Sequence, residues 1–225
     1  MNKKIGCLII HGFAGNLKDI EKLNRFLLKK GFETSCPLLK GHALTKKDLA
    51  RTSYSDWISS AEESLMELSK KSDRVVLIGF SMGGLIAFNL AIKHDIYKMV
   101  TLSAPIYHWD LKRMVTNIIN DIKIRKTEQL RNYIRTSTNI PFRALLNFKL
   151  LLYRTKPLLS QITCPIYIAQ GLMDDTVKHK SANYIYRNVA STQKIMKFYN
   201  NSPHVICNGP DFRELCADIK IFIDN

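Results

Sequence analysis

The stretch GFSMG, at residues 79–83, decides how the fold of this chain is interpreted. An apolar run (RVVLI, 74–78) comes directly before it, and a helix-like run (GLIAFNLA, 84–91) follows directly after it. A glycine two residues to either side of Ser81 lets a strand turn sharply into a helix, because side chains there would collide. The pattern predicts a nucleophile elbow, with Ser81 in a strained conformation and exposed above a sheet. The alternative is an ordinary strand–helix turn with a surface serine.

Outward from this stretch, strand-like and helix-like runs alternate along the chain. Strands are expected at 5–10, 32–37, 75–80, 97–103, 165–169 and 194–199, and helices at 19–30, 55–70, 180–188 and 211–223. Continuous apolar runs such as IGCLII (5–10) are typical of strands buried on both faces. The alternation predicts the α/β class, with a mostly parallel six-stranded sheet wrapped by helices.

The alternation is interrupted once, by 105–160, where the pattern predicts helices and no strand. An insertion at this point of an α/β sheet typically covers the site at the C-terminal ends of the strands. We therefore expect a core at 1–104 and 161–225 and a small helical cap at 105–160. The apolar residues of this cap that could line a substrate pocket are Ile118, Leu145, Leu146 and Phe148. The alternative is a cap that packs on itself.

Length and composition set the general class of protein. The chain has 225 residues, of which 46% are hydrophobic and 24% charged, as in one large globular domain. Its apolar runs are strand-length, and its N-terminus has no signal-peptide pattern. Five cysteines, an odd number, indicate reduced thiols. These features predict a cytoplasmic protein.

The formal net charge of +15 is unusual, and much of the excess lies in the predicted cap. Residues 105–160 contain 11 Lys and Arg but only 3 Asp and Glu. This excess predicts weak peripheral contact with anionic lipid; solvated surface charge is the alternative. Because no basic–aromatic recognition motif is present, no nucleic-acid partner is expected. The oligomeric state stays open.

Two residues late in the chain could activate Ser81. A serine hydroxyl needs a neutral imidazole to take its proton and a carboxylate to orient that imidazole. Asp174 follows the predicted strand 165–169, and His204 follows the strand 194–199. The order Ser, Asp, His, each after its own strand, is the order that this type of sheet requires. Asp175 adjoins Asp174 and is an alternative acid.

The negative charge that develops on a reacting carbonyl oxygen also needs hydrogen-bond donors. The amide of Met82, directly after Ser81, is one candidate. The other is the amide of Phe13, in the loop HGFAGN (11–16) after the first strand. A plain glycine turn is the alternative interpretation of this loop.

Several motifs in one order carry a family resemblance. They are H-G-F-x-G-N at 11–16, K-G-H at 40–42, G-x-S-x-G-G at 79–84 and L-x-A-P-x-Y at 102–107, followed by the late Asp174 and His204. Together they resemble the small capped carboxylesterases and monoacylglycerol lipases of the α/β-hydrolase fold, over nearly the whole chain. The chain departs from the family pattern at Ala43, where glycine is frequent, and at Pro203, directly before His204.

The resemblance implies a serine hydrolase with nucleophile Ser81, base His204 and acid Asp174. The substrates implied are short- or medium-chain acyl esters or a monoacylglycerol, cleaved through an acyl-enzyme intermediate without metal or cofactor. A thioesterase or a lysophospholipase with the same triad stays open as an alternative. So does a non-catalytic binding protein of the same fold.

Overall fold

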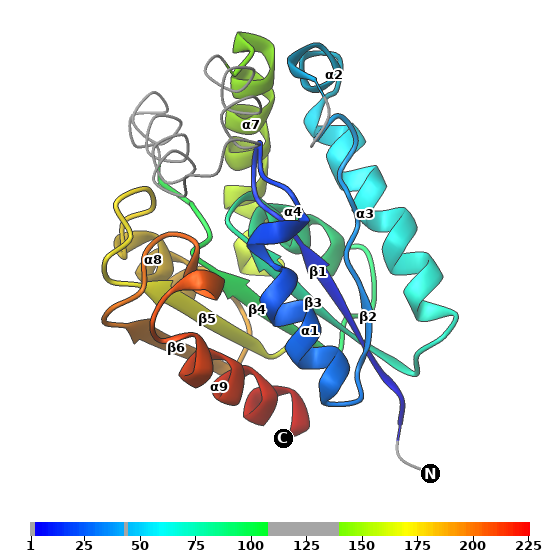
Figure 1. The fold of residues 1–225 in the computed structure, drawn as a ribbon, viewed down its shortest axis with the longest axis vertical. Helices are drawn as coiled ribbons and strands as arrows, with labels where there is room; N and C mark the ends of the chain where they lie inside the picture. The colour runs from blue at the N-terminus through cyan, green and yellow to red at the C-terminus, as the bar shows by residue number, and fades with distance from the viewer. Residues whose placement is uncertain (1–2, 43–44, 108–139) are drawn as a thin grey trace, which may run out of the picture.

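A six-stranded sheet forms the centre of the computed structural model, which describes residues 3–42, 45–107 and 140–225 (Figure 1). The strands are β1 (Ile5–Ile10), β2 (Glu33–Ser35), β3 (Arg74–Phe80), β4 (Lys98–Leu102), β5 (Ile166–Gly171) and β6 (Lys194–Tyr199). Their order is β2-β1-β3-β4-β5-β6, and every neighbouring pair is parallel. The predicted α/β architecture is confirmed, with the second strand shorter than the expected 32–37.

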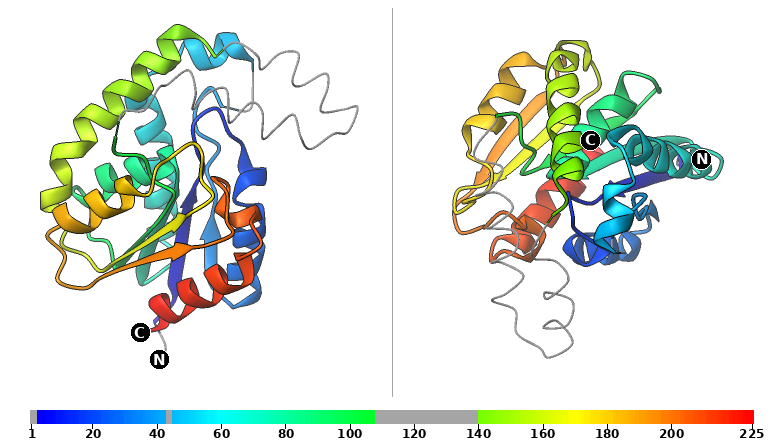
Figure 2. Two further views of the ribbon diagram at one scale, coloured as in Figure 1. Left: turned by 90° about the vertical axis from the view of Figure 1, so that its left-hand side faces the viewer. Right: turned by 90° about the horizontal axis from the view of Figure 1, so that it is seen from above.

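The two faces of the sheet are covered by separate layers of helices (Figure 2). One layer holds α1 (Glu21–Lys29) and α9 (Phe212–Asp224), and the other holds α3 (Tyr54–Ser69), α4 (Met82–Ala91), α7 (Phe142–Thr155) and α8 (Lys180–Asn188). A hydrophobic cluster lies under each layer. Because helices cover both faces, the central strands β3, β4 and β5 are buried along nearly their whole length, which explains their mostly apolar sequences.

Short elements complete the fold. They are α2 (Lys46–Ala50) and the 3₁₀ turns η1 (Leu17–Asp19), η2 (Lys156–Gln161) and η3 (Ile206–Asn208). The helix α2 was not among the elements expected from the sequence, although a capping box marks its start. The Thr45 side chain accepts from the Asp48 amide, and the Asp48 carboxylate accepts from the Thr45 amide. Ser53 and Asp56 form the same arrangement at the start of α3.

The described part of the predicted cap consists of its two ends. Residues 108–139, which include Ile118, lie outside the described residues. The helix α7 packs against α4, α3 and α2, and its inner face joins the same hydrophobic cluster as α4. The cap boundaries at 105 and 160 stay a prediction.

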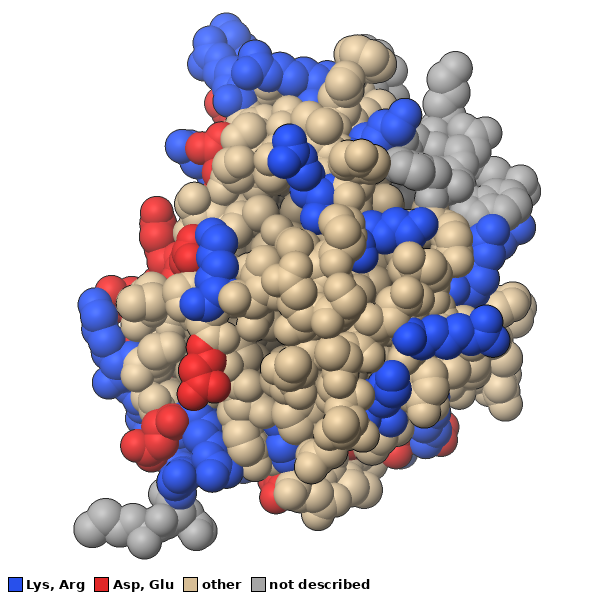
Figure 3. All heavy atoms as spheres, turned by 180° about the vertical axis from the view of Figure 1, so that it is seen from behind, with Lys and Arg blue, Asp and Glu red and all other residues tan. Residues whose placement is uncertain are grey.

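The basic character of the chain is visible on its surface. On the face that carries α3, α4, α7 and α8, Lys and Arg side chains are widespread, and Asp and Glu gather toward one edge (Figure 3). Among the described residues, no helix has the length and apolar character needed to cross a membrane.

Candidate active site

Ser81 occupies the sharp turn between β3 and α4. Its φ is +50° and its ψ is −120°, a backbone conformation that costs a non-glycine residue about 1–3 kcal/mol. Its amide donates to the Leu102 carbonyl oxygen at 2.8 Å, which fixes the turn against β4. A Cβ on Gly79 would lie 2.5 Å from the Gly83 carbonyl oxygen, and one on Gly83 would lie 2.2 Å from that of Ile10. Both glycines are therefore required, and the predicted strained turn is confirmed.

The expected exposure of Ser81 is not found. The residue is only 2% exposed, because neighbouring loops close around it. A Cβ on Gly12, in the loop after β1, would lie 3.2 Å from the Ser81 Cβ. The loop after β6 brings His204 against the serine from another direction.

His204 connects Ser81 to Asp174 through its two ring nitrogens. Its Nε2 lies 3.1 Å from the Ser81 Oγ, and its Nδ1 lies 2.9 Å from the Asp174 Oδ2. When Nδ1–H donates to the carboxylate, Nε2 carries the lone pair that accepts the serine proton. Both side chains are buried: His204 is 3% exposed and Asp174 is 0% exposed. The three residues predicted from the end of three different strands are thus brought together.

The two adjacent aspartates have different surroundings. Asp174 points inward, and its Oδ1 accepts from the amides of Thr176 at 2.9 Å and Val177 at 2.7 Å. Asp175 is exposed and accepts from the Thr176 hydroxyl at 3.1 Å. The geometry therefore favours Asp174 over Asp175 as the acid that faces His204.

Gln170, near the end of β5, is a further contact of Asp174 that the sequence analysis missed. Its side chain is fully buried, and its Nε2 donates to the Asp174 Oδ2 at 2.8 Å. The same nitrogen contacts the carbonyl oxygens of Gly171 at 3.2 Å and Val177 at 3.1 Å. With this bond, the two Asp174 oxygens accept four hydrogen bonds in total. The only signal in the sequence is a polar residue inside an otherwise apolar strand.

The two predicted amide donors belong to segments that adjoin Ser81. Met82 is the first residue of α4, where backbone amides lack partners within the helix and carry the positive end of its dipole. Phe13 is in the loop whose Gly12 approaches the serine. Its neighbour Ala14 has a φ of +51°, so the loop bends sharply here. That these two amides bind an oxyanion stays a prediction.

An aromatic cluster supports the Phe13 loop from behind. The Phe13 ring stacks on the Phe148 ring of α7 with centroids 5.0 Å apart. It also packs against Trp57 of α3, with ring centroids 5.7 Å apart. His42 contacts Trp57 edge-on at 5.3 Å and His11 at 5.2 Å. Elements from distant parts of the chain therefore fix the position of this loop.

The two histidines of the cluster are neutral at neutral pH. Burial lowers the pKa of His11 to about 4 and that of His42 to about 3. The His11 Nε2 accepts from the Leu39 amide at 3.2 Å, and its Nδ1 donates to the Gly12 carbonyl oxygen at 2.8 Å. These bonds hold the loop, because both ring nitrogens of His11 are occupied by backbone groups.

The cap candidates have different positions. Phe148 is buried and contacts the Phe13 loop, whereas Leu145 packs partly buried against the core. Leu146 is 39% exposed and faces away from the core. Ile118 lies outside the described residues. Of the described candidates, Phe148 has a direct contact with the Phe13 loop.

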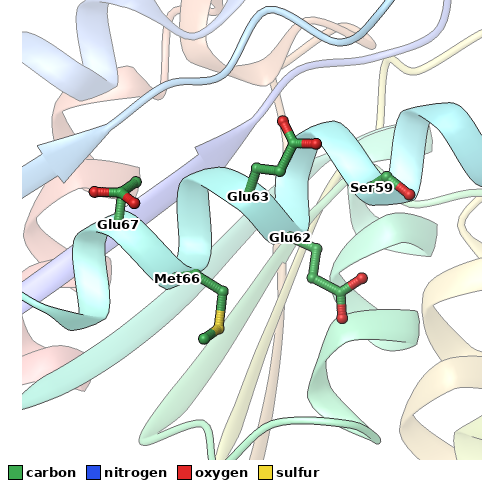
Figure 4. Close-up of a pocket in the computed structure, with 5 residues that line it drawn as sticks. All are labelled: Ser59, Glu62, Glu63, Met66 and Glu67. Atoms are coloured by element: carbon green, nitrogen blue, oxygen red, sulfur yellow. The ribbon is translucent and has the colours of Figure 1, made fainter.

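An open surface pocket of about 620 Å³ lies along α3 (Figure 4), and Ser81 is not among its lining residues. Its lining residues all belong to one helix: Ser59, Glu62, Glu63, Met66 and Glu67. Glu62 already pairs with His94 at 2.7 Å and with Lys93 at 3.6 Å. Within 3–42, 45–107 and 140–225, three or more His, Cys, Asp or Glu side chains nowhere gather as a metal site. The expected independence from metals stays a prediction.

Comparisons with known sequences identify a family and two relatives. The family model described as serine aminopeptidase, S33 (Hydrolase_4) matches residues 2–211. A thermostable monoacylglycerol lipase of Bacillus sp. (strain H-257) is 31% identical over 215 residues, covering 91% of this chain and 84% of that protein. A carboxylesterase of Bacillus subtilis (strain 168) is 25% identical over 224 residues, covering 96% and 91%.

Solved structures show the same fold. A structure reported for the metagenome-derived lipolytic enzymes LipS and LipT has a TM-score of 0.82 at 20% identity, covering 99% of this chain and 95% of that chain. A monoacylglycerol lipase of Paleococcus ferrophilus has a TM-score of 0.71 at 15% identity, covering 97% and 94%. The resemblance seen in the sequence motifs is confirmed: the chain has the α/β-hydrolase fold and belongs to the Hydrolase_4 family, described as serine aminopeptidase, S33.

Proposed function

We propose that this protein is a serine hydrolase that cleaves carboxylic esters of small molecules or lipids. One observation carries the proposal: at a strained strand–helix turn, Ser81 contacts His204, which in turn contacts Asp174. A structural serine has no need of a buried imidazole held by a buried carboxylate, whereas a nucleophilic serine needs both to transfer its proton. The family membership and the names of the two Bacillus relatives support the same conclusion.

The first half of the reaction forms an acyl-enzyme. The Ser81 Oγ attacks the ester carbonyl carbon while the His204 Nε2 takes the hydroxyl proton. The carbonyl electron pair moves onto oxygen, where the amides of Phe13 and Met82 would stabilise it. When the carbon–oxygen bond to the alcohol breaks, His204 returns the proton to the departing alcohol oxygen. Asp174 stabilises the imidazolium that exists between these two steps.

The second half releases the acid. Water attacks the acyl carbon, and the His204 Nε2 takes one water proton. The bond between the acyl carbon and the Ser81 Oγ then breaks, and the proton passes from His204 to that oxygen. Ester and water are thereby converted to carboxylic acid and alcohol, with the enzyme restored. Apart from this water, the proposed cycle uses only residues of this chain.

The proposed substrates are short- or medium-chain acyl esters or a monoacylglycerol. The relatives named monoacylglycerol lipase and carboxylesterase support this choice. Fold and triad alone do not separate esters from thioesters or lysophospholipids, since all three react at an acyl carbon with the same residues. The cytoplasmic location stays a prediction.

A substrate series with a matched variant tests the proposal. Chromogenic esters from acetyl to palmitoyl, 1-monoacylglycerols, an acyl thioester and a lysophospholipid are compared at equal concentration. We expect the wild-type protein to cleave esters and Ser81→Ala to lose about 10⁴-fold or more of kcat. A fluorophosphonate should add to the wild type and not to Ser81→Ala, as measured by intact mass. Ester cleavage by Ser81→Ala at the wild-type rate, or a folded wild type without ester turnover, would overturn the proposal.

A further inference from the structure

The outward face of α7 carries a stripe of large apolar side chains. Phe142 is 78% exposed, Leu146 39%, Leu150 44% and Tyr153 69%. These residues are three or four positions apart, so they follow one another along a single face of the helix. Single exposed apolar residues are ordinary, but a contiguous row of four marks a surface that meets something other than water. We call these four residues the α7 stripe.

The opposite face of α7 packs on the protein. Ala144, Phe148, Leu151, Leu152 and Thr155 are buried there. Phe148 stacks on Phe13, so the inner face of this helix reaches the loop beside Ser81. The helix therefore has two apolar faces, one directed at the candidate active site and one directed outward.

Basic side chains border the stripe on both sides. With about 100° of rotation per residue, Lys149 lies along one edge of the stripe and Arg143 and Arg154 lie along the other. All three side chains are exposed, and the helix sequence FRALLNFKLLLYRT contains no acidic residue. On the face of the molecule that includes α7, Lys and Arg side chains stand among uncharged surface (Figure 3).

We propose that the α7 stripe, with Arg143, Lys149 and Arg154, docks this protein on an anionic phospholipid bilayer. An apolar helix face between rows of Lys and Arg is the arrangement that lies in a membrane interface, with the apolar side chains among the acyl chains and the cations at the phosphates. Long basic side chains can reach the headgroups while the apolar residues between them are buried. The net charge of +15 attracts the whole molecule to the same surface.

The charges argue for a bilayer over a second copy of the chain. In a two-fold contact through α7, the stripe of one copy would face that of the other. The three cations of each copy would then gather at one interface, with no acid on either helix to pair with them. On a negatively charged lipid surface, by contrast, the three cations face phosphate groups of opposite charge and are attracted to them.

This inference rests on the proposed function and deepens it. A lipid-borne ester leaves the bilayer close to the protein that docks there. Because α7 contacts the bilayer with one face and the Phe13 loop with the other, docking brings the candidate active site to the membrane surface. The protein would then act on lipid esters at the interface and on dissolved esters in water.

Vesicle binding tests the docking surface directly. The full-length Ser81→Ala protein is mixed with vesicles of phosphatidylcholine alone or with about a third phosphatidylglycerol, and bound protein is measured by flotation. We expect binding to the anionic vesicles, weakened by salt. Replacing Arg143, Lys149 and Arg154 by Gln should reduce the partition coefficient on the order of 100-fold, and Leu150→Ser about 10-fold.

Matched controls separate the effect of the α7 stripe from the effect of net charge or exposed apolar surface elsewhere on the protein. The triple variant Lys22→Gln, Arg25→Gln and Lys29→Gln removes the same charge from exposed positions on α1, on the opposite layer. Met66→Ser removes an apolar side chain that is 50% exposed on α3. Both should leave vesicle binding within about threefold of the parent protein, whereas equal losses in control and α7 variants would overturn the proposal.

The remaining outcomes keep docking and catalysis apart. With Ser81 intact, every α7 variant should hydrolyse a dissolved butyrate ester at the parent rate, because the stripe faces away from the site. Ester turnover without vesicle binding would overturn docking and leave the proposed function standing. Vesicle binding without any ester turnover would overturn the proposed function and leave docking on the bilayer standing. A dimer in sedimentation analysis that Leu150→Ser converts to monomer would show that a second copy, and not lipid, covers the stripe.

Discussion

Ser81 has a polar side and an aromatic side. Hydrogen bonds hold the polar side in place, and the packing of rings holds the aromatic side. On the polar side, His204, Asp174 and Gln170 form a chain of hydrogen bonds between 2.8 and 3.1 Å long. On the aromatic side, His42 and Phe13 lie among rings 5.0–6.2 Å apart, and the buried His42 Nε2 has no partner among the described residues.

The difference shows which side can move a proton. Directional hydrogen bonds set the tautomer and orientation of His204, so that small changes of atom type there should alter the chemistry. Packing sets the place of the Phe13 loop, so that changes of shape and burial there should alter stability first. Mutations on the polar side should therefore lower turnover most, and mutations on the aromatic side should lower stability most.

The largest effect is expected at His204. In His204→Gln, the side chain can still form hydrogen bonds but cannot take and return a proton, so kcat should fall about 10⁴-fold or more with stability little changed. Turnover of a butyrate ester and thermal unfolding measure the two quantities. His179→Gln, at an exposed histidine, should keep kcat within about twofold of the wild type. A loss of kcat below about 10-fold in His204→Gln would contradict the contrast between the polar and aromatic sides of Ser81.

The two aspartates offer the next largest effect. Asp174→Asn places an amide where His204 needs an acceptor, and we expect kcat to fall about 10³- to 10⁴-fold. Asp175→Asn makes the same change one residue away, on an exposed side chain, and should keep kcat within about threefold. Single-turnover kinetics on both variants measure the contrast. Equal losses in the two would show that the choice of Asp174 is wrong.

The parts of the site that could be predicted from the sequence are those tied to strand ends. Ser81, Asp174 and His204 each follow a strand of a parallel sheet, and topology places such positions at one edge. Residue order and local glycines are therefore enough to predict that the three residues meet. The inner strands β1, β3, β4 and β5 could be predicted because burial on both faces favours apolar runs, whereas the edge strands β2 and β6 are only partly buried.

The parts that could not be predicted depend on which side chains meet across the fold. Gln170 shows only as a polar residue in an apolar strand, and nothing local indicates that its amide contacts Asp174. The burial of Ser81 results from distant loops. The apolar residues of α7 have helical spacing, but this pattern alone does not separate packing on α4 from membership of a cap.

A substitution at Gln170, on the polar side of Ser81, should have a smaller effect on turnover than those at His204 and Asp174. Gln170→Met keeps the length of the side chain and removes the donor to Asp174, so the carboxylate should lose its fixed position. We expect kcat to fall about 10- to 100-fold with KM nearly unchanged, and the free energy of unfolding to drop by about 1–3 kcal/mol. Thr101→Val is the matched control, because Thr101 is also buried in the sheet and its hydroxyl has no partner in the described structure. If both variants lost only stability, Gln170 would have no positioning role.

His42 should have the smallest effect on turnover and a clear effect on acid stability. Burial lowers its pKa to about 3 in the folded chain, against about 6.5 when unfolded. Below pH 6.5, His42 is therefore protonated in the unfolded chain and stays neutral in the folded chain. The free energy of unfolding consequently falls as the pH drops. His11, with a folded pKa of about 4, adds to the same loss between pH 6.5 and 4. In His42→Leu this loss should shrink by about 3 kcal/mol at pH 4, as measured by urea unfolding at pH 7 and pH 4. His179→Gln, at an exposed histidine, should leave the pH dependence as it is in the wild type. An unchanged acid loss in His42→Leu would mean that the aromatic side does not exclude the proton, and the contrast between the two sides would fail there.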